Sequence, residues 1–205
     1  MSAPASSVST RARCLRCERP LTACICRFAA RPPLAGALEL LILQHPLERH
    51  QPKGTARLLQ LGLANCRLLC GERFEPPPAD GRIGLLLYPD TPDMPEAPPL
   101  PQPLPPPERL RLVVLDGSWR KSRVLLHANR WLQALPRLAL DGLPDRASPY
   151  AALRKARRAG QLSTLEAGAL ALQRLEPGLP LDALRQGFEA FVAWQRQQAG
   201  SRRLP

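Results

Sequence analysis

Four cysteines near the amino terminus are spaced closely enough to bind one metal ion. Four thiolates can surround Zn²⁺ tetrahedrally at about 2.3 Å each, and such a closed site stabilises a segment too small for its own core. Four unrelated reduced thiols are the alternative. We predict a structural zinc knuckle with arginines around it that can face RNA. The spacing is C-x2-C-x6-C-x-C, and the cysteines are Cys14, Cys17, Cys24 and Cys26.

A carboxylate at the end of the segment LVVLDGSW is a candidate for catalysis. Asp116 follows an apolar strand candidate, and Gly117 allows a tight turn before Ser118, which can cap the next helix. Open α/β sheets bind ligands at the carboxyl ends of their strands. Asp116 can therefore accept a proton from a substrate or hold a cationic group. A turn or capping aspartate is the alternative.

Other polar residues lie at the ends of expected elements. His45 and Glu48 follow the first strand, where they can bind a ligand or act as acid and base. A structural histidine is the alternative. The segment 163–166, STLE, fits a capping box, which needs no functional explanation. Cys66 and Cys70 lie four residues apart on a strand candidate, so we expect them to share a face as buried, inert thiols.

The elements that position these residues alternate between strand and helix. Short apolar runs predict strands at 37–43, 66–70, 83–88 and 112–115. Helical patterns cover 56–63, 118–129, 151–158, 163–176 and 182–198. This alternation predicts an α/β fold with a mainly parallel sheet flanked by helices.

Proline separates one part of the chain from the rest. Nine of the 16 residues from 92 to 107 are proline, which predicts a surface loop over 89–107. A ligand for a proline-binding module is the alternative.

We expect a tail with the cysteine cluster over 1–33 and one catalytic α/β domain over 34–200.

The charge of the chain indicates a polyanionic partner. The 205 residues carry a net charge of +12, and 26 of the 29 basic residues are arginine, whose planar fork suits phosphate. A compositional bias is the alternative. One helix is expected to carry a stripe of Arg120, Arg123, His127 and Arg130, with Val124, Ala128 and Trp131 facing elsewhere. RNA binding and a solvated helix face explain the stripe equally well. The same two alternatives apply to the basic run 154–158.

The absence of some patterns excludes other classes. No apolar run approaches the about 20 residues that a membrane-spanning helix needs, and the first residues lack the apolar core of a secretion signal. We therefore expect a cytoplasmic protein, in which cysteines favour metal binding or chemistry over disulfides. The sequence contains neither G-x-G-x-x-G after a strand nor a P-loop, so it does not support a dinucleotide-binding or P-loop nucleotide-binding unit.

Taken in order, the motifs resemble those of the DTW-domain family of tRNA-uridine aminocarboxypropyltransferases. They are CxxC-x6-CxC, LQHPLE, LLLYP, VVLDGSW, Y-x2-LRK and LSTLEA, from about Cys14 to Gln195. The Asp-Thr-Trp of the family name is replaced by the stretch from Asp116 to Trp119, in which Ser118 keeps the hydroxyl group.

The resemblance implies a reaction, a fold and a set of site residues. S-adenosylmethionine would donate its 3-amino-3-carboxypropyl group to N3 of a tRNA uridine and leave as methylthioadenosine. The fold would be related to the knotted SPOUT type, although the hydrophobic pattern reveals no knot. Asp116 is the candidate base or orienting carboxylate, and Arg154 can pair with the donor's carboxylate. The residues expected to line the pocket are His45, Glu48, Ser118, Trp119, Arg154, Ser163 and Thr164.

Two other functions remain open at this point. One is a knotted RNA methyltransferase that uses the same donor but transfers its methyl group. The other is a noncatalytic, zinc-dependent RNA-binding module, as the cysteine cluster and the charge of +12 alone would suggest.

Overall fold

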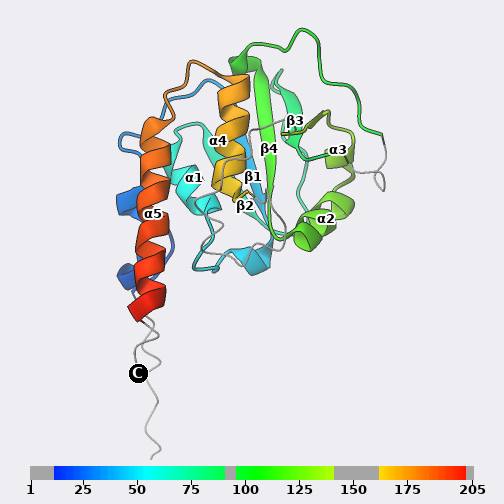
Figure 1. The fold of residues 1–205 in the computed structure, drawn as a ribbon. Helices are drawn as coiled ribbons and strands as arrows, with labels where there is room; N and C mark the ends of the chain where they lie inside the picture. The colour runs from blue at the N-terminus through cyan, green and yellow to red at the C-terminus, as the bar shows by residue number, and fades with distance from the viewer. Residues whose placement is uncertain (1–11, 91–95, 141–161, 202–205) are drawn as a thin grey trace, which may run out of the picture.

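The structure is a computed structural model that describes residues 12–90, 96–140 and 162–201 (Figure 1). Its centre is one sheet in which every strand pairing is parallel. The strands are β1 (Glu39–Gln44), β2 (Cys66–Cys70), β3 (Ile83–Leu87), β4 (Leu110–Asp116) and β5 (Arg137–Leu138). They lie in the order β2-β1-β4-β3-β5. The predicted parallel α/β fold is confirmed, and β5 is an additional strand.

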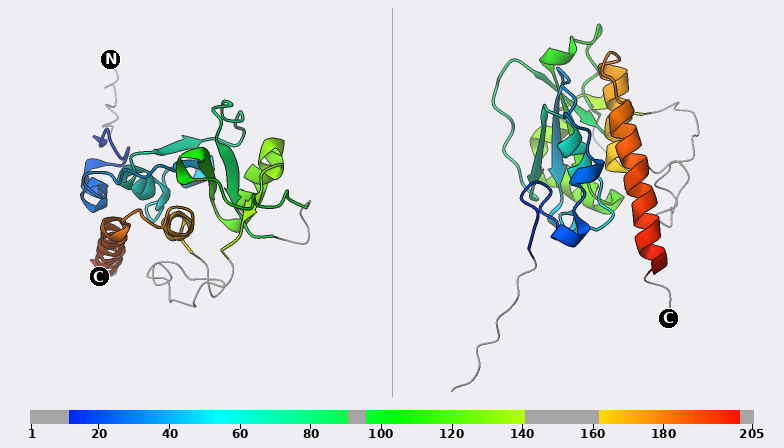
Figure 2. Two further views of the ribbon diagram at one scale, coloured as in Figure 1. Left: turned by 90° about the horizontal axis from the view of Figure 1, so that it is seen from above. Right: turned by 90° about the vertical axis from the view of Figure 1, so that its left-hand side faces the viewer.

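Helices cover both faces of the sheet (Figure 2). They are α1 (Ala56–Gly62), α2 (Trp119–Ala128), α3 (Arg130–Gln133), α4 (Thr164–Leu175) and α5 (Asp182–Ser201). Alternate residues of each central strand point to opposite faces, so Leu40 and Ile42 pack with α1, α4 and α5, whereas Leu41 and Leu43 pack with α2 and α3. Both faces are therefore apolar, as continuous apolar strands such as LLIL require.

The two central strands place their last residues side by side. β1 and β4 pair in a register that sets Gln44 opposite Asp116, and β1 and β2 set Gln44 opposite Cys70. The short helix η3 (Pro46–Glu48) follows β1, and α2 follows β4. The carboxyl edge of the sheet, at the bottom of Figure 1, thus gathers these polar residues.

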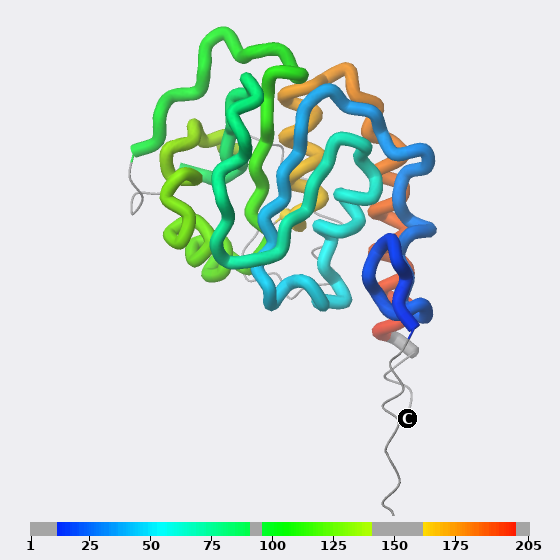
Figure 3. Tube along the Cα trace, turned by 180° about the vertical axis from the view of Figure 1, so that it is seen from behind, coloured from blue at the N-terminus to red at the C-terminus, as the bar shows by residue number. Residues whose placement is uncertain are grey.

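The amino-terminal segment packs against the last long helix. Two short helices, η1 (Leu21–Ala23) and η2 (Cys26–Phe28), lie beside α5 (Figure 3). The Phe28 ring lies 5.9 Å from that of Phe191 and 5.6 Å from that of Trp194. Ile25 is fully buried in the same apolar cluster as α5 and the sheet. The cysteine-rich segment therefore shares the main core.

The contact between η2 and α5 depends on a glycine. A Cβ atom added at Gly187 would lie 2.0 Å from the carbonyl oxygen of Phe28, so the two backbones would have to move apart. We expect Gly187→Ala to lower the free energy of unfolding by at least about 2 kcal/mol, measured by urea denaturation. Gly178→Ala is the control, because its added Cβ would meet nothing within 4 Å. Equal stability of the two variants would contradict the close packing.

Several sequence predictions concern the connecting segments. Residues 96–106 of the proline-rich loop form no helix or strand and end at η4 (Pro107–Arg109). The predicted helix over 151–158 lies outside the described residues, as does the chain joining β5 to α4 between 141 and 161. The relationship to the knotted SPOUT type stays a prediction. Within the described ranges, no helix is long and apolar enough to cross a membrane.

Candidate functional site

Asp116 is held at the carboxyl edge of the sheet by two side chains from other elements. Its carboxylate accepts a hydrogen bond from Gln44 Nε2 at 2.8 Å and one from the Thr164 hydroxyl at 2.5 Å. Asp116 is buried, with 6% of its surface exposed. A carboxylate can accept about four hydrogen bonds, so two anchoring donors are compatible with a further role as an acceptor. The end of β4 thus carries a rigidly placed, buried carboxylate.

The segment after β1 supplies two more buried polar residues, His45 and Glu48. The backbone N–H of His45 donates to the carbonyl of Asp116 at 3.0 Å. The ring Nδ1 of His45 accepts from the Leu47 N–H at 3.2 Å, and Nε2 lies 3.5 Å from a Glu72 carboxylate oxygen. His45 therefore caps η3, which supports the structural alternative for its Nδ1 atom.

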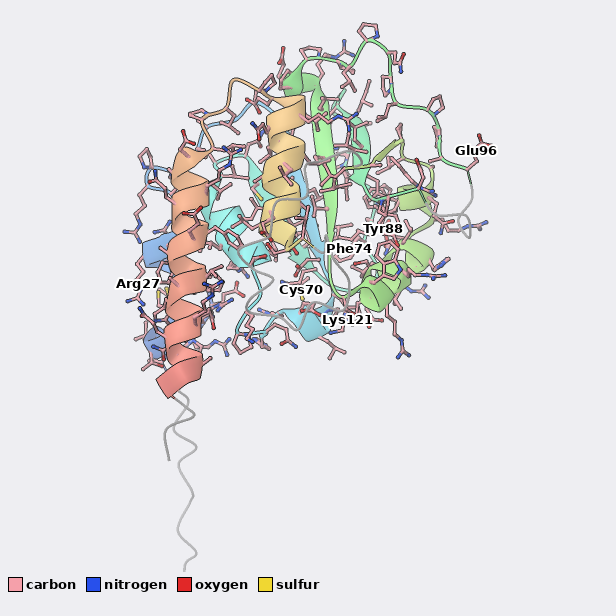
Figure 4. All side chains as sticks on the ribbon, in the orientation of Figure 1. Arg27, Cys70, Phe74, Tyr88, Glu96 and Lys121 are labelled. Carbon is pink, nitrogen blue, oxygen red and sulfur yellow. The ribbon has the colours of Figure 1, made fainter. Side chains whose placement is uncertain are left out.

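Glu48 is paired with a lysine from the other side of the edge. Lys121 of α2 donates from Nζ to Glu48 Oε1 at 2.8 Å, and both side chains are largely buried. Since an isolated buried carboxylate is costly, this pair explains why Glu48 can lie inside the protein. The bond ties η3 to the first turn of α2. Figure 4 shows Lys121 and Cys70 at this same end of the sheet.

The remaining predicted pocket residues are in different situations. Ser163 caps α4 by accepting from the Glu166 N–H at 3.3 Å, and Glu166 accepts from the Ser163 N–H at 2.8 Å, which confirms the capping box. Ser118 occupies the cap position of α2, but its side chain makes no cap hydrogen bond, so that part of the prediction is wrong. Arg154 lies outside the described residues.

Trp119, the first residue of α2, lies on the outside of the site. Its ring stacks on Tyr88, with centroids 5.2 Å apart and planes inclined by 16°. Tyr88 is buried, whereas Trp119 is 45% exposed. One face of the indole is therefore fixed by the protein while the side chain remains accessible.

Sequence reasoning missed Gln44 and Lys121, which contact two of the predicted residues. The signal for Gln44 was its place as a polar residue at the end of an apolar strand and next to His45. Lys121 gave no local signal, because its partner lies 73 residues away. Both contacts arise from the way that strands and helices meet at the sheet edge.

The four amino-terminal cysteines converge as a metal site requires. Their Sγ atoms all lie within 4.8 Å of one another, and the pairs Cys14–Cys26 and Cys17–Cys24 are each 3.7 Å apart. A tetrahedral zinc site with Zn–S bonds of about 2.3 Å needs sulfur separations of about 3.8 Å. The residues present therefore fit a bound metal ion of this kind.

The acidity of the thiols differs within the cluster. Backbone hydrogen bonds from Cys17 and Arg16 lower the pKa of Cys14 to about 6, which favours its thiolate. Burial raises the pKa of Cys26 to about 12. A metal ion deprotonates coordinating thiols outright, so both groups can serve as thiolate ligands once a metal is bound.

The cysteines outside the cluster only partly match their prediction. Cys66 is buried, and burial raises the pKa of its thiol to about 12, as expected of an inert core cysteine. Cys70 is exposed, so the prediction that it is buried was wrong. It is the last residue of β2, which lies at the edge of the sheet formed by the described residues.

The cysteine cluster is braced against the segment between η3 and α1. Arg19 donates to the carbonyl oxygens of Pro52 and Gly54 at 2.7 and 2.8 Å. Glu18, which follows Cys17, forms ion pairs with Arg49 and Arg57 at 3.2 and 2.8 Å. The segment of the cysteine cluster thus supports the loop that leaves the carboxyl edge of the sheet, and this loop links the cluster to the candidate catalytic site.

The parallel sheet with helices on both faces defines an α/β domain, a class in which ligands bind at the carboxyl ends of the strands, where this chain carries the buried Asp116. More particularly, the chain belongs to the DTW domain family, because residues 11–196 match that family. It is similar to tRNA-uridine aminocarboxypropyltransferase 2 of Drosophila melanogaster, with 31% identity over 182 residues that cover 81% of this chain and 67% of the relative. No solved structure matches the chain.

Proposed function

We propose that this protein transfers the 3-amino-3-carboxypropyl group of S-adenosylmethionine to N3 of a uridine in tRNA. The product is 3-(3-amino-3-carboxypropyl)uridine, and methylthioadenosine is released. The observation that carries the proposal is the similarity to a relative named tRNA-uridine aminocarboxypropyltransferase 2, combined with membership of the DTW domain family. The anchored Asp116 and the net charge of +12 support it.

The reaction needs alignment and removal of one proton. The N3–C bond forms as the C–S⁺ bond of the donor breaks. The electron pair of the broken C–S bond stays with sulfur, which becomes the neutral thioether of methylthioadenosine. The imide proton of N3 must leave in the same reaction. Because the carbon next to a sulfonium is already electrophilic, the protein mainly has to hold the nucleophile in line with it.

Asp116 is the residue that we propose to accept the imide proton of N3. Gln44 and Thr164 both donate to its carboxylate, so its oxygens are held in place as acceptors. A positioned base of this kind typically contributes about 10²–10⁴-fold to the rate. The same carboxylate would serve equally as the orienting group for the uridine imide.

The other predicted residues complete the proposed pocket around this carboxylate. His45 and Glu48 lie on the segment after β1, and Thr164 begins α4 with its hydroxyl on Asp116. Arg154 is proposed to pair with the carboxylate of the donor, which would otherwise be buried unpaired. Ser118, Trp119 and Ser163 remain proposed neighbours of the donor or the uridine.

Zinc is the metal that we propose for the cysteine cluster. Four thiolates with near-tetrahedral spacing leave no ligand position for a substrate, so the ion would have a structural role. We also keep the proposed division into a metal-binding segment over 1–33 and a catalytic domain over 34–200, and the proposed relationship of that domain to SPOUT-type folds.

The leaving product identifies the reaction. Purified protein incubated with S-adenosylmethionine and unmodified tRNA is expected to release methylthioadenosine, and nucleoside mass spectrometry should detect the aminocarboxypropyl group on uridine. Release of S-adenosylhomocysteine would instead identify a methyltransferase. Binding of tRNA with no product of either kind would leave the noncatalytic RNA-binding module as the better account.

A further inference from the structure

The outer face of α2 carries a hollow whose described lining includes Trp119 but not Asp116. Its volume is about 680 Å³, and it is open to the solvent rather than enclosed. Among the residues that the structure describes, those that line it belong to α2. They are Trp119, Arg120, Arg123, Val124, His127 and Ala128.

The lining combines basic and apolar side chains on one surface. Sequence analysis placed Val124 and Ala128 away from the basic stripe, but they line the same hollow, so that prediction was wrong. Val124 is 42% exposed and Trp119 is 45% exposed. Arg130, the fourth member of the expected stripe, lies on α3 because α2 ends at Ala128.

Trp119 is held as a rigid part of this surface. Its stacking on the buried ring of Tyr88 fixes the orientation of the indole, so little conformational entropy is lost when a ligand stacks on it. Single-stranded nucleic acids bind to such surfaces, because bases stack on aromatic rings while arginines contact the backbone phosphates. The helix contains no acidic residue that would repel phosphate.

The hollow differs from what a buried small-molecule donor would need. A donor pocket in an α/β domain draws on several strand ends and loops, whereas the lining of this hollow within the described residues comes from α2. The hollow lies on the helix that follows β4, since α2 starts three residues after Asp116 at the same edge of the sheet. A polymer that reaches Asp116 would pass over this surface.

We propose that the outer face of α2 is an RNA-docking surface that receives an unpaired nucleotide next to the modified uridine. This inference rests on the proposed function, since N3 lies on the pairing edge of uridine and is reachable only in unpaired RNA. Arg120 and Arg123 contact phosphates, and Trp119 with Val124 forms the apolar floor for a base.

Charge reversal tests the phosphate contacts. We expect the double variant Arg120→Glu, Arg123→Glu to weaken binding of unmodified tRNA by about tenfold or more in fluorescence anisotropy at low salt. The slope of log affinity against log salt should fall by about one to two. The control is Arg109→Glu, which makes the charge change of one of these two substitutions at the opposite end of β4 and should stay within about twofold of wild type. An equal loss of tRNA affinity in the double variant and in Arg109→Glu would contradict the proposed docking surface.

Fluorescence tests the stacking contact separately. A short single-stranded oligouridine should quench the tryptophan emission of the wild-type protein, and Trp119→Leu should abolish most of that quenching. Unchanged quenching in Trp119→Leu would overturn the base contact. Quenching by poly-glutamate but not by oligouridine would assign the hollow to an acidic protein segment and overturn the RNA proposal.

The binding and turnover assays distinguish the two proposals. If wild-type protein forms methylthioadenosine while the α2 variants bind tRNA as tightly as wild type, the docking surface is wrong and the proposed function stands. If the wild-type protein forms no product, and the α2 variants bind tRNA more weakly than both wild type and the Arg109→Glu control, the docking surface stands and the proposed function is wrong. At saturating tRNA, the double arginine variant should retain turnover within about threefold.

Discussion

Asp116→Asn is expected to reduce the rate of transfer by about 10²–10⁴-fold at saturating tRNA and S-adenosylmethionine. The amide keeps the shape of the carboxylate but cannot take the imide proton of uridine. The affinity for tRNA should stay within about threefold, because the Asp116 side chain is buried and the proposed RNA-docking surface lies on the outer face of α2. Methylthioadenosine release in single-turnover conditions measures the rate, and anisotropy measures the affinity.

Two partner variants separate a chemical role of Asp116 from a structural one. Thr164→Val removes the hydroxyl that donates to Asp116 Oδ1, and Gln44→Leu removes the amide that donates to Oδ2. Each should slow transfer by about tenfold, less than Asp116→Asn, because the carboxylate remains but is less well placed. Thermal melting checks that all three proteins fold. A large loss of tRNA affinity with normal turnover at saturation would contradict the role assigned to Asp116.

Cys24→Ser is expected to abolish stoichiometric zinc binding and to lower the free energy of unfolding by several kcal/mol. A structural zinc site contributes directly to folding, and the cysteine cluster proposed to hold zinc packs into the main core through Cys17, Ile25 and Cys26. The loss should therefore also loosen the contact of η2 with α5. Elemental analysis of the purified protein measures the zinc, and urea denaturation measures the stability.

Cys70→Ser is the matched control for the zinc experiment. It makes the same chemical change at an exposed cysteine outside the cluster, so its stability should stay within about 0.5 kcal/mol of wild type with zinc retained. Removal of zinc from the wild-type protein by a chelator should reproduce the effect of Cys24→Ser. Elemental analysis that finds no stoichiometric zinc in the purified wild-type protein would refute the proposed zinc site.

Local patterns predicted the regular elements well. The strand over 66–70 matches β2 in both bounds, and the helices over 163–176 and 182–198 correspond to α4 and α5. Short apolar runs and a capping box are local signals, so they can be recognised in the sequence without knowledge of the fold. β5 was missed because its two residues are too few to show a period. The end of α2 was placed correctly to within a residue, but the sequence did not reveal that Arg130 starts another helix.

The sequence alone determined which groups are able to react. It identified four cysteines at a metal-binding spacing and a carboxylate where a buried strand ends, because both signals lie within a few neighbouring residues. Only the tertiary structure decided what holds that carboxylate. Gln44 and Thr164 lie 72 and 48 residues from Asp116, and they meet it through the register of β1 with β4 and the placement of α4. Such contacts depend on long-range packing, which no local pattern encodes.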